Sequence, residues 1–344
     1  MGDQKREGHE TTRIMGEGSE RKNFQTQRLK TMFPGKTDAE IVRINRRFLQ
    51  DAEPFSLSNL KEAMTTDTDG LSTGFEKFDA DVSIPEGALT LVCGGAKRGK
   101  TLFMLNLLYN AARAVRGKHM LYYTCETTRP ALELKLINLA GTKPFDLDAE
   151  NPRPSSNLAC WKRKLTSLTE AELLKFAAAE GAYAGLKNFM EVAGRIHLVD
   201  GPYDVSRLIE SIRLFSGPFR VGAVFIDFLQ GVSLEEGYAD SAPAADVEKL
   251  NRLRRFAAGC DFPIVVATQI SPAFPLHLEE DGWRDWPASL EGLQHFADLI
   301  LAVQRLPHPD ENVLIARVLA SRIGHETSFR FAIDPHLFNL SESG

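Results

Sequence analysis

The sequence has few cysteines and no long apolar run. Its 344 residues include four cysteines, Cys93, Cys125, Cys160 and Cys260, and no Cys-x-x-Cys pair, which argues against zinc. Reduced thiols in a cytosolic protein are the simpler interpretation. No uncharged apolar run reaches the roughly 20 residues that a membrane helix needs, and the N-terminus has no apolar core typical of a secretory signal. We therefore expect a cytoplasmic protein without a membrane partner.

The sequence also lacks a large excess of positive or negative charge, because its net charge is only −5. Residues 1–50 hold 11 Lys/Arg and 7 Asp/Glu, a local charge of +4. Subtracting these from the totals of 41 and 46 leaves 30 and 39, so the remaining residues carry −9. The body of the chain lacks the basic balance typical of nucleic-acid-binding domains, and such binding would need a local patch.

Composition divides the chain into four parts. Residues 1–36 are polar and charged at both signs, which predicts a disordered, basic arm. Residues 37–70 begin with a capping-box pattern and predict short helices and a linker. Residues 71–336 alternate between apolar runs and helical patterns, which predicts one large domain. Residues 337–344 are interpreted as a tail.

The large domain is predicted to be an α/β fold. We predict strands at 89–93, 120–125, 196–199, 221–227, 263–269, 299–304, 313–320 and 328–333. We predict helices at 101–116, 169–186, 205–215 and 245–259. Continuous apolar runs are typical of a mainly parallel, twisted sheet with helices on both faces. The last two strands have little between them, so we expect a hairpin.

The most specific motif is a Gly-rich loop of the kind that cradles phosphate. The pattern G-x-x-x-x-G-K-[ST] is matched without a gap by Gly94, Gly95, Ala96, Lys97, Arg98, Gly99, Lys100 and Thr101, with Leu102 next. A predicted strand precedes it and a helix follows, which is the geometry of a P-loop. Lys100 would lie between the β- and γ-phosphates, and the Thr101 hydroxyl would complete the Mg²⁺ shell. We therefore expect ATP and Mg²⁺ here, with Lys97 and Arg98 as exposed loop charges.

Three other predicted strands end in side chains that suit ATP hydrolysis. Asp227 could hold the water shell of Mg²⁺. Glu126 could polarise an attacking water, or it could cap the next helix. Gln269 could sense the γ-phosphate, or it could cap a loop. Because ligands bind at the carboxyl ends of such strands, we expect these residues at one edge.

The order of these motifs resembles the C-terminal, RecA-like ATPase domain of DnaB-type replicative helicases. The resemblance covers about residues 56–334, and its motifs lie at 71–79, 99–106, 124–128, 226–230, 267–270 and 296–298. It implies that Lys100 and Thr101 bind phosphate and magnesium and that Glu126 is the catalytic base. It also implies that Asp227 holds the metal shell and that Gln269 couples the γ-phosphate to motion.

The resemblance also implies partners. Residues 319–324 are similar to the strand whose arginine reaches a neighbouring subunit's nucleotide, so Arg322 would act in trans as an arginine finger. The alternative for Arg322 is a plain surface arginine. The implied partners are further copies of the chain in a ring, usually of six, together with single-stranded DNA and a loader or primase-like protein.

Several features differ from the family pattern. Ala320 stands where family members often carry lysine, and residues 1–55 are too few and too polar to replace the family's helical N-terminal domain. The segments 233–246 and 270–297 are acidic, which repels DNA phosphates, and other basic residues, such as those at 252–255, could contact DNA instead. Two hypotheses follow: a hexameric helicase or translocase on single-stranded DNA, or a RecA-like loader or regulatory ATPase that controls protein assembly without unwinding. A small-molecule phosphotransferase lacks support.

Overall fold

The computed structural model describes Thr37, residues 70–141, Thr169, Glu172 and residues 183–201, 203–235, 242–270, 292–307, 309–322 and 327–343. The chain divides into two units, Met1–Asp67 and Thr68–Gly344, and apart from Thr37 the described residues belong to the second. The arm and nearly all of the linker predicted for residues 1–70 therefore lie outside the described residues.

The described residues form a nine-stranded sheet in the order β11-β10-β9-β8-β1-β7-β5-β2-β3. The strands that lie side by side from β3 to β8 are parallel, and β8 to β11 pair antiparallel. Their bounds are β1 Leu89–Gly94, β2 His119–Thr124, β3 Ile196–Asp200, β5 Val221–Asp227, β7 Ile264–Gln269, β8 Leu299–Arg305, β9 Val313–Ser321, β10 Ser328–Asp334 and β11 Asn339–Ser343. The predicted strands, the mainly parallel sheet and the hairpin of β9 and β10 are confirmed.

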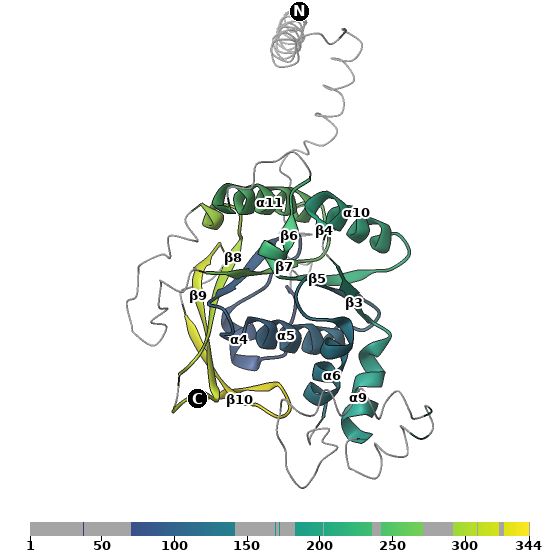
Figure 1. Ribbon diagram of the computed structural model, residues 1–344, viewed down its shortest axis with the longest axis vertical. Helices are drawn as coiled ribbons and strands as arrows, with labels where there is room; N and C mark the ends of the chain where they lie inside the picture. Colours follow the sequence, from purple (N-terminus) through teal and green to yellow (C-terminus); the bar gives the residue numbers. More distant parts are fainter. Residues whose placement is uncertain are drawn as a thin grey trace, which may run out of the picture. The chain divides into compact units, whose positions relative to one another are not determined.

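Helices cover both faces of this sheet (Figure 1). One face carries α4 (Glu76–Asp81), α5 (Lys100–Ala114), α6 (Arg129–Leu139) and α9 (Tyr183–Ala193), and the other carries α10 (Val205–Ser216) and α11 (Ala242–Ala257). Two separate groups of buried side chains fill these layers. β1 and β5 are buried at every position because both of their faces are covered, which explains their continuous apolar sequences. A short parallel pair, β4 (Tyr203–Asp204) and β6 (Val232–Ser233), adds a second small sheet.

Some helices differ from the sequence prediction. Neither α4 nor α6 was among the predicted helices, because α4 has only six residues and α6 opens with Arg129-Pro130. Proline in the first turn costs no hydrogen bond, so it begins the helix rather than breaking it. Most of the helix predicted at 169–186 lies outside the described residues, and α9 continues to Ala193.

The prediction of a tail at residues 337–344 was wrong. Residues 339–343 form β11, which pairs with β10 at the edge of the sheet. Leu340 is buried and its N–H donates to Asn106 Oδ1 of α5 at 3.0 Å. The Glu342 carboxylate accepts hydrogen bonds from the N–H groups of Lys77 (3.0 Å) and Phe78 (2.9 Å). Strand β11 thus caps the start of α4 through Glu342 and is hydrogen-bonded to α5 through Asn106.

We expect Glu342→Ala to lower the free energy of unfolding by about 1 kcal/mol, because two N–H groups at the start of α4 lose their acceptor. The measurement is the midpoint of urea-induced unfolding. Ser341→Ala is the matched control, since Ser341 is exposed in the same strand. Equal midpoints for the two variants would contradict the capping role.

Candidate nucleotide site

The glycines of the phosphate loop are required by close packing. A Cβ on Gly94 would lie 2.4 Å from the Val303 backbone oxygen of β8. Gly99, the residue before α5, has a φ of 97°, in the left-handed region that favours glycine. A Cβ on Gly99 would also lie 2.6 Å from Leu314 Cδ1 of β9, a fully buried side chain. Strands β8 and β9 therefore hold the loop in one shape.

Lys100 is buried inside this loop. Its Nζ donates to the Gly94 oxygen at 3.0 Å and to the Gly95 oxygen at 2.8 Å. Burial lowers the pKa of Lys100, and the nearby negative charges of Asp227 and Glu126 partly oppose that effect. The ammonium thus lies inside the phosphate loop. A bound phosphate would carry negative charge that stabilises this buried cation. Lys97 and Arg98 are exposed, as expected.

The predicted metal residues lie together. Asp227 ends β5 and is 6% exposed, and its Oδ2 accepts a hydrogen bond from Thr101 Oγ1 at 2.8 Å. The same Oδ2 accepts a hydrogen bond from the hydroxyl of Tyr122 in β2 at 2.7 Å. A carboxylate and a hydroxyl, both oxygen donors beside a phosphate loop, are ligands that suit Mg²⁺. The donor set therefore fits this metal.

Glu126 and Gln269 lie at the same edge of the sheet. Glu126 follows β2, is exposed and carries a charge that acts on Lys100 and Lys135. It does not cap the next helix, because Thr128 occupies the position before α6. Gln269 ends β7 in register with Gly94 of β1, and its side chain is exposed. Both side chains are therefore free to meet a nucleotide on the loop.

Three residues near the site were missed by sequence reasoning. Tyr122 binds Asp227 across 105 positions of sequence. Burial lowers the pKa of Lys135 in α6, and the negative charges of Asp227 and Glu126 partly oppose that effect. Gln230 donates to Thr268 Oγ1 at 2.9 Å and accepts from the Gln269 N–H at 3.1 Å. Tyr122 and Lys135 stand in no recognisable motif. Gln230 closes the motif at 226–230, but that motif gave no sign of which groups its side chain contacts.

Arg322 lies at the amino-terminal ends of the parallel strands, opposite the strand ends that carry the phosphate loop. Leu314, near the start of β9, lies against Gly99, whereas Arg322 follows the end of β9, eight residues further along. At about 3.3 Å per residue, this places Arg322 roughly 26 Å from the phosphate loop of its own chain. Its Nε pairs with Asp298 Oδ1 at 3.2 Å, while its side chain stays 59% exposed. The structure does not bring Arg322 to the other predicted catalytic residues within one chain.

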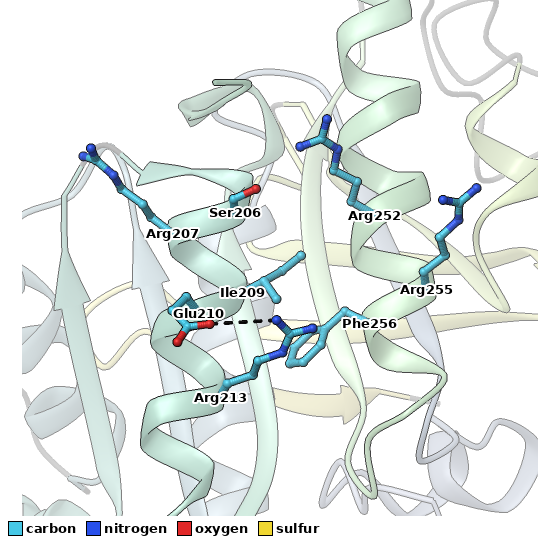
Figure 2. Close-up of a pocket in the computed structure, with 8 residues that line it drawn as sticks. All are labelled: Ser206, Arg207, Ile209, Glu210, Arg213, Arg252, Arg255 and Phe256. Atoms are coloured by element: carbon cyan, nitrogen blue, oxygen red, sulfur yellow. Dashed lines mark ion pairs between the residues drawn. The ribbon is translucent and has the colours of Figure 1, made fainter. Parts of the chain in front are cut away.

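The basic residues near 252–255 are largely engaged within the chain. Four arginines, with Glu210 and Phe256 among their neighbours, line a hollow of about 590 Å³ between α10 and α11 (Figure 2). Arg252 pairs with Glu235 at 2.7 Å and with Glu248 at 2.8 Å. Arg254 pairs with the buried Asp298 at 3.0 Å. Contact with DNA by Arg252 or Arg254 would have to break these pairs.

Comparison with known proteins identifies the family. Residues 70–277 match the family described as DnaB-like helicase C terminal domain, so the chain belongs to the DnaB-like helicases and carries their ATPase domain. One similar solved structure is an ATPase domain with a TM-score of 0.64 and 17% identity, covering 85% of this chain and 100% of that one. A DnaB-like replicative helicase, described with its interactions with primase, has a TM-score of 0.62 and 16% identity over 94% of this chain and 76% of that one. No curated protein matches in sequence.

These findings confirm the RecA-like fold and the resemblance to DnaB-type helicases, and they make the chain a replicative-helicase-like ATPase. Nucleotide binding follows from the same family membership. Among the described helices, none combines the length and apolar character needed to cross a bilayer.

We expect Gly94→Ala to weaken ATP binding about tenfold or more, because the new methyl meets the Val303 backbone oxygen and must displace the loop whose carbonyls hold Lys100. A tenfold change corresponds to roughly 1.4 kcal/mol, the scale of one charged hydrogen bond. Titration with a fluorescent ATP analogue measures it. Gly194→Ala is the matched control, since a Cβ there has nothing within 4 Å. Unchanged affinity in Gly94→Ala would show that the loop tolerates the methyl.

Proposed function

We propose that the chain is one subunit of a hexameric ring that hydrolyses ATP, moves along single-stranded DNA and separates its strands during replication in the cytoplasm. The observation that carries the proposal is the division of the site between two edges of one sheet. Lys100, Thr101, Asp227 and Glu126 lie at the carboxyl edge, and Arg322 lies at the other. A site that uses all of them requires a second copy of the chain.

Each residue has a part in the proposed hydrolysis. The loop and Lys100 bind the phosphates, and Thr101 and Asp227 hold the metal. Bound Mg²⁺ would neutralise charge on the β- and γ-phosphates. Glu126 orients and polarises the attacking water. Arg322 of a neighbouring subunit stabilises charge on the γ-phosphoryl group, the role that an arginine finger has in related ATPases.

Gln269 is proposed to couple the nucleotide to DNA. Its side chain is exposed beside Gly94, and its backbone N–H is held by Gln230, which also bonds to Asp246 near the start of α11 at 3.1 Å. The segments that follow β5 and β7 are proposed to contact the DNA backbone in the ring. A loader or a primase-like protein is a further proposed partner, since a similar DnaB-like helicase is described with primase.

A second candidate is a loader or regulatory ATPase that controls protein assembly without unwinding DNA. The pairing of Arg252 and Arg254 within the chain favours it, because these arginines are withdrawn from DNA phosphates. The acidic residues of segment 270–297 point the same way.

We expect single-stranded DNA at low salt to stimulate ATP hydrolysis several-fold, because Gln269 is proposed to couple DNA contact to the γ-phosphate. A phosphate-release assay with and without oligonucleotide measures this. Lys100→Ala should abolish turnover in both conditions and serves as the control for contaminating ATPases. Hydrolysis that depends on Lys100 but is indifferent to DNA would favour the second candidate.

We expect Arg322→Ala to bind ATP normally but to hydrolyse it at least about 1,000-fold more slowly, since arginine fingers contribute on that scale. Mixing subunits of Arg322→Ala with subunits of Lys100→Ala should restore part of the activity. In mixed rings an intact Lys100 of one subunit meets an intact Arg322 of its neighbour. If two inactive variants stay inactive after subunit exchange, although native mass spectrometry shows mixed rings, the trans assignment fails.

A further inference from the structure

A buried tyrosine shares the carboxylate proposed to hold the metal. Tyr122 is fully buried in β2, and its hydroxyl donates to Asp227 Oδ2 at 2.7 Å. Its ring lies beside that of Phe225, with the ring centres 6.3 Å apart, so packing fixes where the hydroxyl points. Burial and the charge of Asp227 raise the pKa of Tyr122 well above its usual value. The contact itself makes the hydroxyl the donor, because the oxygens of an ionised carboxylate can only accept hydrogen bonds.

The two protein donors act on one oxygen of Asp227. Oδ2 accepts from Thr101 at 2.8 Å and from Tyr122 at 2.7 Å. An ionised carboxylate has two oxygens with about two acceptor sites each. The two donors thus fill the sites on Oδ2 and leave Oδ1 for the metal or its water.

We propose that Tyr122 is a positioning residue that limits Asp227 to one available oxygen and thereby favours Mg²⁺ over Ca²⁺. Mg²⁺ demands octahedral geometry and retains several waters, which a single carboxylate oxygen can orient. Ca²⁺ takes six to eight oxygens and readily binds both oxygens of one carboxylate. Holding Oδ2 in the protein removes the second contact that the larger ion would use. This inference rests on the proposed nucleotide site.

The test compares Tyr122→Phe with Tyr123→Phe. Phenylalanine keeps the ring and removes only the hydroxyl. The Tyr123 hydroxyl bonds to Ser211 Oγ at 2.9 Å, on the face of the sheet covered by α10, whereas Tyr122 belongs to the core on the other face. Both variants therefore lose one hydroxyl hydrogen bond from the same strand, but only one loses it at the metal carboxylate.

The readout is the affinity for a fluorescent, non-hydrolysable ATP analogue as a function of Mg²⁺ or Ca²⁺ concentration. In Tyr122→Phe we expect the half-saturating Mg²⁺ concentration to rise and that of Ca²⁺ to stay level or fall. The preference for Mg²⁺ should then drop about tenfold, the scale of one hydrogen bond to a charged group. Tyr123→Phe should keep the wild-type preference, even if its melting temperature falls as much as that of Tyr122→Phe.

Two outcomes would overturn the proposal: an unchanged preference in Tyr122→Phe, or an equal shift in both variants. A measurement without metal separates failure of the Tyr122 proposal from failure of the proposed nucleotide site. Nucleotide affinity in excess EDTA depends on the phosphate loop and should be the same in wild type and Tyr122→Phe. If the wild type does not bind the analogue, or if Lys100→Ala does not weaken binding, the nucleotide site itself is wrong.

Discussion

The buried ammonium of Lys100 is the constraint on which the site depends. A cation withdrawn from water costs several kcal/mol unless it is hydrogen-bonded and faces negative charge. The loop carbonyls of Gly94 and Gly95 supply the first condition, and Asp227 and Glu126 supply the second. These groups come from β1, β2 and β5, so the order of the parallel strands is what brings them together. The sheet therefore brings together the groups that surround this buried lysine.

Strand β9 links the two sites to which one subunit is proposed to contribute. Its beginning presses on Gly99 through Leu314, and Arg322 follows its end. Asp298 anchors that end: its carboxylate accepts from the Leu89 N–H of β1 and pairs with both Arg254 and Arg322. If Arg322 leaves to meet a neighbour's nucleotide, Arg254 still neutralises the buried carboxylate. Arg322 can thus move without leaving Asp298 unpaired. Removing the partner of a buried charge costs roughly 3–5 kcal/mol.

Local patterns predicted the centre of the fold well. The P-loop motif is short, continuous and flanked by a strand and a helix, so the structure around Lys100 followed from neighbouring residues. Asp227 could be placed beside Thr101 because parallel strands share a carboxyl edge. The contacts of Tyr122, Lys135 and Gln230 could not be predicted, because they are set by sheet order and side-chain direction rather than by spacing. The strand β11 was missed because its sequence has a single large apolar residue, Leu340, and its stability comes from α4 and α5.

The charges of the domain bear on how such a protein would hold DNA. Arg252 and Arg254 each pair with a carboxylate of the same chain, so their charge stabilises the fold around α10 and α11. Glu235, counted from sequence among the acidic residues that repel DNA, is bound to Arg252 and Ser206 and does not act as a free charge. Part of the apparent basic patch and part of the apparent acidic repulsion are therefore neutralised by ion pairs within the domain. Affinity for a phosphate backbone grows with the number of free cations that meet it. A DNA-binding surface on the described part of this domain would therefore have to draw on cations other than Arg252 and Arg254.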